Sequence, residues 1–428
     1  MIPRYEIPEI SSIWAEDAKF SYFLKVEMAL LKALEEAKVF PPIGKHFQNA
    51  KINLDRIHEI EAKVHHDVIA FCTSITEQVG SEGKFFHYGC TSSDIIDTAL
   101  SLQLRDSLKI EIKALKELRD ALWFRALGTK NLYTLGRSHG MFAEPMSFGF
   151  KFLSYVAEFS RRLIDLEKFE MDLTGQMSGA VGNYTILTPE IEEKVMKELG
   201  LKVEPLSTQV IPRDRLATLA SIQAGIADAF ERLAIEIRHL HRSDVGEVVE
   251  GFKPGQKGSS TMPHKKNPIA SENISGLARV IRSHVQIAHE NTLLWHERDI
   301  SHSSSERMWV PDSFGLTVYA LRRATRMINE LHVNEDKITA RTQEQFATAS
   351  SYILHKLIPS YEGTREDLYA HIQSASFESK NREEFIKALK NKGLKIDELK
   401  LDSNEGMYRE QTEAVFKRIE KTYNLKTT

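Results

Sequence analysis

Hydroxyl and amine side chains gather in one polar stretch, residues 251–272, with the sequence GFKPGQKGSSTMPHKKNPIASE. Its repeated glycines and prolines exclude a continuous helix or strand. The hydroxyls and cations of this stretch are Ser259, Ser260, Thr261, Lys257, Lys265 and Lys266. A mobile loop of this composition suits closure over an anionic substrate and chemistry at a hydroxyl, and an ordinary domain linker is the alternative.

The end of this loop predicts the start of a helix. Asn267 followed by Pro268 is typical of an N-cap and the first helical residue. The new N-terminus would add free N–H groups and the positive end of a helix dipole, both of which favour anions. The spacing GxxxxGK[ST] of a nucleotide-binding P-loop does not occur in this stretch.

Histidines stand in other breaks between helical patterns. His139 lies in LGRSHGMFAEP, with Gly136 and Gly140 nearby. Glycines allow a substrate to approach the ring closely, and an imidazole pKa near ~6.5 suits proton transfer at neutral pH. A structural histidine is the alternative at this position and also at His66 and His87.

The sequence HYGCTSSD continues from His87 with hydroxyl and N–H donors at Thr91, Ser92 and Ser93. Such donors could hold a substrate carboxylate. They could equally cap the helix that follows, and both roles are compatible.

Two arginines flank several serines in a further motif, ERDISHSSSERMWVPDS, residues 297–313. Arg298 and Arg307, with Ser303 and Ser304 between them, could clamp a phosphate or a carboxylate. A solvated turn with a surface salt bridge fits the same spacing. Residues such as Arg4 and Tyr5 would ordinarily belong to a frayed terminus.

The remaining histidines and the composition exclude several classes. His65/His66 and His239/His241 do not share a helix face, and HExxH is absent from the sequence, so no metal site is predicted. The formal net charge of −3 argues against nucleic acid or an anionic membrane as the main partner. The two cysteines have no CxxC spacing, and no signal or membrane-spanning pattern occurs, so we expect a cytoplasmic protein.

Helical periodicity dominates the chain. Amphipathic patterns predict helices over Trp14–Ala37 and Ile57–Ile75. Longer helical stretches follow at Ile95–Leu127, Pro145–Leu173, Pro212–Val249, Pro268–His296 and Asp312–His332. A helix over 212–249 would be roughly 55 Å long, so it needs lateral partners, and either the same chain or other subunits could supply them.

No alternation of strands and helices occurs, which excludes a dinucleotide-binding fold. We predict an all-α protein with three helical domains. They are an N-terminal domain of residues 1–94, a central long-helix bundle of 95–346 with a mobile catalytic loop at 251–267, and a C-terminal cap of 347–428.

Several motifs resemble those of the fumarase/aspartase superfamily. GSSTMPHKKNP, followed by Ser271 and Glu272, resembles its GSSxMPxKxNP loop, and GRSHGMFAEP and HYGCTSSD resemble two further regions. Within the superfamily, RYEIPEISSIW, HHDVIAF, STQVIPRD and ERDISHSSSER are similar to segments of the bacterial adenylosuccinate lyase family. The chain departs from the family at His65, where many members have Arg, and at Met141, where other branches have Gln.

The resemblance implies an activity. Members of this family eliminate fumarate from adenylosuccinate, giving AMP, and from the succinylaminoimidazole carboxamide ribotide of purine biosynthesis. They use no metal and no organic cofactor. They form homotetramers with a twenty-helix core and with active sites shared between subunits. The alternatives are argininosuccinate lyase or another fumarate-releasing lyase, or an inactive crystallin-like scaffold.

The resemblance also implies roles for particular residues. Ser259 would be the general base and His139 the general acid, and Lys265 and Glu272 would organise the site with His66 and His87. The residues expected to bind substrate are Arg4, Tyr5, His65, Asp67, Thr91, Ser92, Gln209, Ser260, Asn267, Arg298, Ser303, Ser304 and Arg307.

Overall fold

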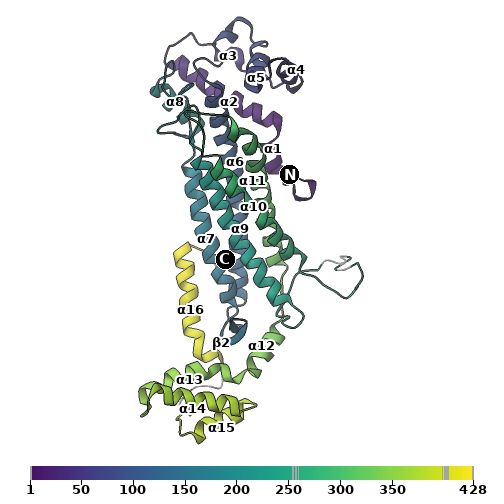
Figure 1. The fold of residues 1–428 in the computed structure, drawn as a ribbon, viewed down its shortest axis with the longest axis vertical. Coiled ribbons are helices and arrows are strands. Elements are labelled where there is room, and N and C mark those ends of the chain that lie inside the picture. The colour runs from purple at the N-terminus through teal and green to yellow at the C-terminus, as the bar shows by residue number, and fades with distance from the viewer. Residues whose placement is uncertain are drawn as a thin grey trace. The chain divides into compact units, whose positions relative to one another are not determined.

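The computed structural model of the chain is predominantly helical (Figure 1). It describes residues 2–252, 255, 258, 260–397, 399 and 404–426, with side chains for all of these except 404–410. The chain divides into two compact units. Unit 1 comprises Met1–Lys116, Arg161–Phe230 and Gly276–Arg322, and unit 2 comprises Glu117–Ser160, Glu231–Ser275 and Arg323–Thr428.

The longest helices confirm the predicted all-α class. They are α6 Ser92–Gly128, α7 Gly149–Met171, α9 Asp214–His241, α10 Ile269–Glu290 and α11 Ser301–Asn329. The boundary between the units falls inside each of them. The 37 residues of α6 make it roughly 55 Å long, whereas the 28 residues of α9 span only about 42 Å.

Unit 1 has an aromatic core at its N-terminal end. This end consists of the 3-10 helices Pro3–Tyr5 and Gly80–Phe85 and the helices α1 Pro8–Ile13, α2 Glu16–Glu36, α3 Gly44–Phe47, α4 Leu54–Val64 and α5 Asp67–Thr76. Phe20 and Phe23 of α2 pack against Phe71 of α5 with ring centroids 5.8 and 5.7 Å apart. All three rings are buried. Burying each stabilises the fold by about 1.5–3 kcal/mol, which fixes α2 against α5.

The predicted helix over 57–75 was wrong, because the chain breaks in its middle. His65 adopts a left-handed φ of 52° and ends α4, and His66 is the N-cap of α5. Nδ1 of His66 accepts the backbone N–H of Ile69 at 3.4 Å. The polar sequence HHD therefore forms a junction between two helices rather than a turn inside one.

A second irregular region of unit 1 links α7 to α9. The two-residue strands β3 Thr174–Gly175 and β4 Lys202–Val203 pair in parallel. In the sequence, α8 Pro189–Leu199 lies between them. Gly182, with φ of 73°, lies so close to the backbone that a Cβ there would be 2.3 Å from the carbonyl oxygen of Ser207. Only glycine permits this approach of two loop segments.

Unit 2 contains an antiparallel hairpin of β1 Tyr133–Ser138 and β2 Met141–Ser147. Its two-residue turn is His139–Gly140, with φ of 52° and 79°. Positive φ at both positions matches the twist of a hairpin. The predicted helix start at Pro145 was wrong, because Pro145 lies in β2 opposite Leu135, a place that proline tolerates in an edge strand.

Three further helix limits differ from the prediction, and the first is that α10 ends at Glu290 rather than at His296. α9 ends at His241, and β5 Val248–Val249 then pairs with β6 His332–Val333. α11 begins at Ser301 and continues through Pro311, so the predicted start at Asp312 was wrong. Buried Trp309 and Phe314 on either side of the proline hold the helix together, since tertiary packing can outweigh the lost backbone hydrogen bond.

The C-terminal part of unit 2 is built from shorter helices. They are α12 Glu335–Glu344, α13 Ser350–Leu357, α14 Arg365–Glu378, α15 Arg382–Asn391 and α16 Asn404–Tyr423, with the 3-10 helices Phe346–Ala349 and Ile358–Ser360. Ile353, Leu368, Phe385 and Leu389 belong to a separate small core. Among the described residues, no helix is long and apolar enough to cross a membrane. The division into three domains stays a prediction.

Candidate active site

The predicted site residues fall into two sets. Those in unit 1 are Arg4, Tyr5, His65, His66, Asp67, His87, Thr91, Ser92, Gln209, Arg298, Ser303, Ser304 and Arg307. Those in unit 2 are His139, Ser259, Ser260, Lys265, Asn267 and Glu272. Ser259, the predicted base, and the neighbouring Lys257 lie outside the described residues.

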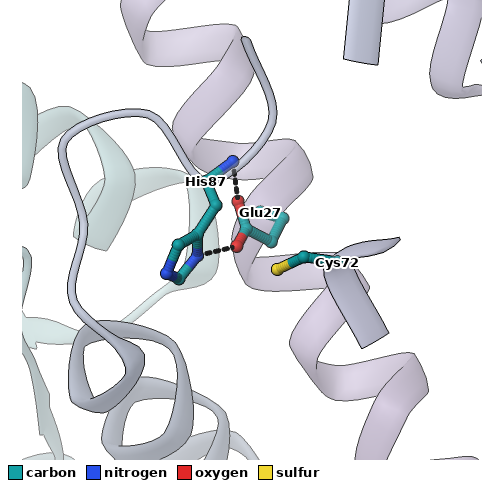
Figure 2. A group of neighbouring side chains, drawn as sticks. All are labelled: Glu27, Cys72 and His87. Atoms are coloured by element: carbon teal, nitrogen blue, oxygen red, sulfur yellow. Dashed lines mark hydrogen bonds and ion pairs between the residues drawn. The ribbon is translucent and has the colours of Figure 1, made fainter. Parts of the chain in front are cut away.

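His87 of unit 1 is held by a residue that sequence reasoning missed. Nδ1 of His87 lies 2.6 Å from Oε1 of Glu27, and the His87 backbone N–H donates to Oε2 at 3.2 Å (Figure 2). Glu27 is fully buried on α2. Burial would lower the pKa of His87, but the hydrogen bond and the charge of Glu27 raise it overall.

Asp94 organises the start of α6, next to Thr91 and Ser92. Its buried carboxylate accepts the backbone N–H groups of Thr91 at 2.8 Å, Ser178 at 3.0 Å and Gly179 at 3.2 Å. Burial raises the pKa of Asp94, and these N–H groups offset part of the rise. Asp94 therefore joins the predicted donor motif to the segment QMSGAVGNY, residues 176–184.

This segment was not singled out in the sequence. Its signal was a Gly/Ser break between two helical patterns. Gln176 donates its side-chain amide to the backbone oxygen of Gln209 at 2.8 Å, and Arg298 donates to Oε1 of Gln209 at 3.0 Å. Two predicted residues, Gln209 and Arg298, are thereby brought together although they are 89 positions apart.

The HHD junction meets α11 through Asp67. Oδ2 of Asp67 lies 2.7 Å from Nζ of Lys19 and 3.5 Å from Nη2 of Arg307. Although burial opposes it, the two cations lower the pKa of Asp67. Arg298 and Arg307 thus have separate partners, and Ser303 and Ser304 lie in the first turn of α11 between them.

The predicted frayed terminus is anchored. Arg4 and Tyr5 belong to the 3-10 helix Pro3–Tyr5, and the Tyr5 ring packs edge-on against Tyr319 with centroids 5.0 Å apart. An edge-to-face aromatic pair of this kind contributes about 0.5–1.5 kcal/mol beyond its burial. Tyr5 therefore has a fixed position in unit 1, and Arg4 before it is exposed.

A buried ion-pair network lies beside Gln209 and Arg307 in the sequence. Arg213 donates to Asp97 at 2.6 and 2.9 Å and to Glu306 at 3.0 and 3.2 Å, and all three side chains are buried. Burial raises the pKa of Glu306 although Arg213 opposes the rise. The network connects α6 and α11 to the segment before α9. It was also missed.

In unit 2, His139 occupies the exposed tip of the β1–β2 hairpin. Arg137, at the end of β1, pairs with the buried Glu247, which also binds Arg341 at 2.8 Å. Glu247 has a lowered pKa despite burial because two guanidinium groups face it. The strand is anchored, and no described residue hydrogen-bonds to the His139 ring.

The predicted mobile loop 251–267, called the lid below, is held together at its base in the part that the structure describes. The side-chain amide of Asn267 donates to the backbone oxygen of Gly258 at 2.8 Å, and His241 Nε2 lies 2.9 Å from the backbone oxygen of Lys266. A Cβ on Gly258 would lie 2.0 Å from the oxygen of Lys265, so only glycine fits there. Ser260 and Lys265 are exposed.

The prediction of free N–H groups at the start of α10 was wrong. Glu250 accepts the backbone N–H groups of Ala270 at 2.9 Å and of Ser271 at 3.0 Å. A protein carboxylate therefore satisfies two of the donors expected to meet an anion. Glu272 is exposed on α10, and in the described residues of the chain it forms no hydrogen bond with His139.

One group of side chains has the composition of a metal site. One potential ligand atom from each of Glu27, Cys72 and His87 lies within 4.8 Å of the others. Burial, reinforced by the charge of Glu27, raises the pKa of the Cys72 thiol well above neutrality. Glu27 already accepts two hydrogen bonds from His87, so the arrangement favours a hydrogen-bonded pair with a protonated thiol beside it.

Curated relatives resemble the chain over almost its whole length. It is 44% identical over 387 residues to the adenylosuccinate lyase of Thermotoga maritima, covering 90% of each chain. It is 40% identical to the adenylosuccinate lyase of Helicobacter pylori, covering 98% of this chain and 100% of the relative.

A family comparison and a solved structure agree with these relatives. Residues 8–283 match the family described as Lyase. The crystal structure of a fumarate lyase from Mesorhizobium sp. BNC1 superposes with a TM-score of 0.83 at 20% identity, covering 99% of each chain, which shows a shared fold. With its helical architecture and these relatives, the chain belongs to the adenylosuccinate lyase family of the fumarase/aspartase superfamily.

Proposed function

We propose that this protein eliminates fumarate from adenylosuccinate to give AMP, and from succinylaminoimidazole carboxamide ribotide in purine biosynthesis. One observation carries the proposal. Residues far apart in the sequence, namely Thr91, Gln209 and Arg298, enter one hydrogen-bonded network through Asp94 and Gln176. This network holds Thr91, Gln209 and the cation Arg298 in one part of unit 1, and a guanidinium favours an anionic substrate. The relatives of the chain, which are named adenylosuccinate lyases, support the same activity.

The first chemical step removes a proton from the carbon beside a succinyl carboxylate. We assign this step to Ser259. A serine hydroxyl is a weak base at its ordinary pKa, so it needs a cationic, water-excluded setting. Lys265 supplies a nearby cation in the sequence, and it would stabilise the charge that develops on the carboxylate in the transition state.

The second step breaks the C–N bond and protonates the departing nitrogen. We assign this proton to His139. An imidazolium can donate a proton to a departing nitrogen, and the place of His139 at the exposed hairpin tip beside Gly140 allows close approach of a substrate. The electron pair of the broken bond stays with the nitrogen, and fumarate leaves with a new carbon–carbon double bond.

We further infer a homotetramer in which different subunits complete each site. His139 lies at the tip of the β1–β2 hairpin and Ser259 in the predicted loop 251–267, and the long helices α7 and α9 separate the two in the sequence, so one chain need not bring them together. Long helices also expose large apolar side chains, including Phe124 at 51%, Ile164 at 56% and Ile235 at 42%. Exposed apolar side chains on helices are typical of surfaces that pack against other chains.

Parallel assays test the activity. Purified protein is mixed with adenylosuccinate or with argininosuccinate, and the release of fumarate is followed by absorbance. We expect turnover of adenylosuccinate and none of argininosuccinate. Turnover of argininosuccinate alone would assign the chain to the sibling activity, and no turnover of either would contradict the proposal.

Subunit mixing tests the shared site. Inactive His139→Gln and Ser259→Ala proteins are dissociated, mixed and reassembled. If the two residues of one site come from different chains, some hybrid sites carry both wild-type residues, and a minority of wild-type activity returns. Well-exchanged hybrids that stay as inactive as the parents would contradict the shared site.

A further inference from the structure

Among the residues that the structure describes, the buried carboxylate of Glu27 forms hydrogen bonds with His87 alone (Figure 2). One of its oxygens lies 2.6 Å from Nδ1 of the imidazole, and the other accepts the His87 backbone N–H at 3.2 Å. A buried carboxylate without partners would cost several kcal/mol. His87 therefore stabilises Glu27, and Glu27 fixes both the ring and the backbone of His87.

The backbone of His87 is itself unusual. Its φ of 60° lies in the left-handed region, which a residue with a side chain occupies only when its surroundings impose it. The second ring nitrogen, Nε2, points away from Glu27 in Figure 2. Within the described ranges of the chain, no residue hydrogen-bonds to Nε2, and the side chain is 24% exposed.

We propose that Glu27 is a positioning residue that fixes the orientation and the Nδ1–H of His87, so that Nε2–H is presented to an anionic group of the substrate. This inference rests on the proposed function, because it requires His87 to meet an anionic substrate. The anion is a phosphate or a carboxylate, since both accept a hydrogen bond from an imidazolium. Glu27 acts only through His87.

The surroundings of His87 favour a positive charge on the ring. The titratable groups near it are Glu27 of α2, Cys72 of α5 and Asp94 of α6. Cys90, which precedes α6, interacts with Glu27, Asp94 and Cys72. Burial raises the pKa of both thiols, which therefore stay neutral. The negative groups are Glu27 and Asp94, and they outweigh the effect of burial, so the pKa of His87 is raised.

The test compares Glu27→Gln with two other variants. Glu27→Gln keeps the shape of the side chain but removes its charge, and Glu27→Asp keeps the charge on a shorter side chain. Glu35→Gln is the matched control, because Glu35 also lies on α2 and accepts the N–H groups of Ile43 at 2.6 Å and Gly44 at 2.5 Å. Circular dichroism and thermal unfolding establish that each variant is folded.

Removing the charge should lower the pKa of His87. The protonated ring is the binding form, so kcat/KM should fall as pH rises through this pKa, and Glu27→Gln should move that fall to lower pH. We expect KM for adenylosuccinate at neutral pH to rise roughly tenfold, with a smaller change in kcat. Glu27→Asp should recover part of the loss, and Glu35→Gln should leave both quantities unchanged.

Product inhibition identifies the anion. Weaker inhibition by AMP, with fumarate unchanged, would place a phosphate at Nε2, and the reverse would place a carboxylate there. A folded Glu27→Gln protein with an unchanged pH profile and unchanged KM would overturn the inference. The inference would also be overturned if the wild type retained Zn²⁺ and Cys72→Ala did not, because Glu27, Cys72 and His87 would then hold a metal.

A failure of the proposed function is distinguishable from a failure of this inference. If the wild type does not act on adenylosuccinate, the elimination itself is contradicted. The pKa of His87 can still be measured by NMR on histidine-labelled protein, with the signal assigned by its loss in His87→Gln. An equal His87 pKa in the wild type and Glu27→Gln would contradict the positioning role, whatever the activity.

Discussion

The two units hold their candidate residues in opposite ways. In unit 1, Thr91 donates its backbone N–H to buried Asp94, and Gln209 accepts hydrogen bonds from Arg298 and from Gln176, which also binds Asp94. In unit 2, His139 stands exposed at a hairpin tip without a hydrogen-bond partner among the described residues. If the proposed roles hold, a network already fixed in the protein recognises the substrate, whereas the proposed proton-transfer groups become organised only when substrate and neighbouring elements surround them.

The two units share one backbone feature. Left-handed φ values occur at His65 (52°), His87 (60°) and His139 (52°), three of the predicted site residues. Non-glycine residues occupy this region rarely and cluster at functional sites. Different contacts hold these backbone conformations in place. Glu27 binds the backbone and ring of His87, and the two-residue hairpin turn imposes the conformation of His139.

The largest effect is expected from the proton-transfer residues of unit 2. Ser259→Ala and His139→Gln should each lower kcat by several orders of magnitude, because each removes a group that moves a proton. Thermal unfolding should stay unchanged, since His139 is exposed. His46→Gln, at an exposed histidine of α3, is the control.

Steady-state kinetics on adenylosuccinate measures this prediction. Retention of more than about a tenth of wild-type kcat by either variant would contradict its assigned role. An equal loss in His46→Gln would mean that substitutions of histidine damage the protein in general.

The buried ion-pair network of Arg213, Asp97 and Glu306 in unit 1 should affect the free energy of unfolding rather than kcat. Arg213→Met leaves Asp97 and Glu306 as unpaired buried carboxylates, and we expect a loss of about 3–5 kcal/mol in the free energy of unfolding. Arg215→Met is the control, because Arg215 is partly exposed and binds Asp172 and Glu204. Its exposed pair with Asp172 should contribute at most about 1 kcal/mol. Arg215→Met leaves one buried carboxylate, Glu204, without its cation, and Glu204 keeps the hydrogen bond from Thr174 at 2.8 Å, so the loss should be smaller than in Arg213→Met.

Denaturant unfolding distinguishes the two arginine variants. Similar losses in the free energy of unfolding for Arg213→Met and Arg215→Met would show that the fully buried network stabilises the fold no more than the partly exposed one. The comparison between the units would then lose its energetic basis.

Arg298→Gln should sharpen the division between binding and chemistry. It removes a cation from the Gln209 network, and a charged hydrogen bond contributes about 1.5–3 kcal/mol, so KM should rise about 10- to 100-fold. kcat should change less than in the variants of unit 2. A fall in kcat with unchanged KM would place Arg298 in the chemical step rather than in recognition.

Sequence patterns located much of this organisation. Helical periodicity predicted the all-α class and the long helices, because an apolar stripe every three to four residues is visible in one dimension. The breaks at His87, His139 and 251–267 were located in the same way. The break at Pro145 was misread, since a proline at a helix start and one in an edge strand give the same local signal.

The supporting residues could not be predicted in this way. Glu27, Asp94 and Arg213 stand in or beside helical patterns, where a charged residue is usually solvent-facing. Only the packing of other segments buries them and gives them partners. Pro311 was misread for a related reason, because the neighbouring buried aromatic residues that stabilise its helix are not recognisable by their spacing.

The smallest effect is expected at the junction of the lid and α10. Glu250 accepts two N–H groups of the first turn of α10 and the hydroxyl of Ser271. Glu250→Ala removes this cap and should lower the free energy of unfolding by about 0.5–2 kcal/mol. Glu250→Gln keeps one acceptor oxygen and should lose less than Glu250→Ala.

The cap also connects stability to catalysis. It fixes the residues that follow Asn267, and Asn267 holds the base of the lid at Gly258. If the lid needs this anchor to place Lys265 and Ser259 over the substrate, kcat of Glu250→Ala should fall several-fold while KM changes little. A variant that loses stability but keeps full kcat would show that the lid is positioned by the substrate alone. The two units would then differ more than their contacts imply, because the substrate alone would position the proposed catalytic groups of unit 2, whereas hydrogen bonds fix those of unit 1.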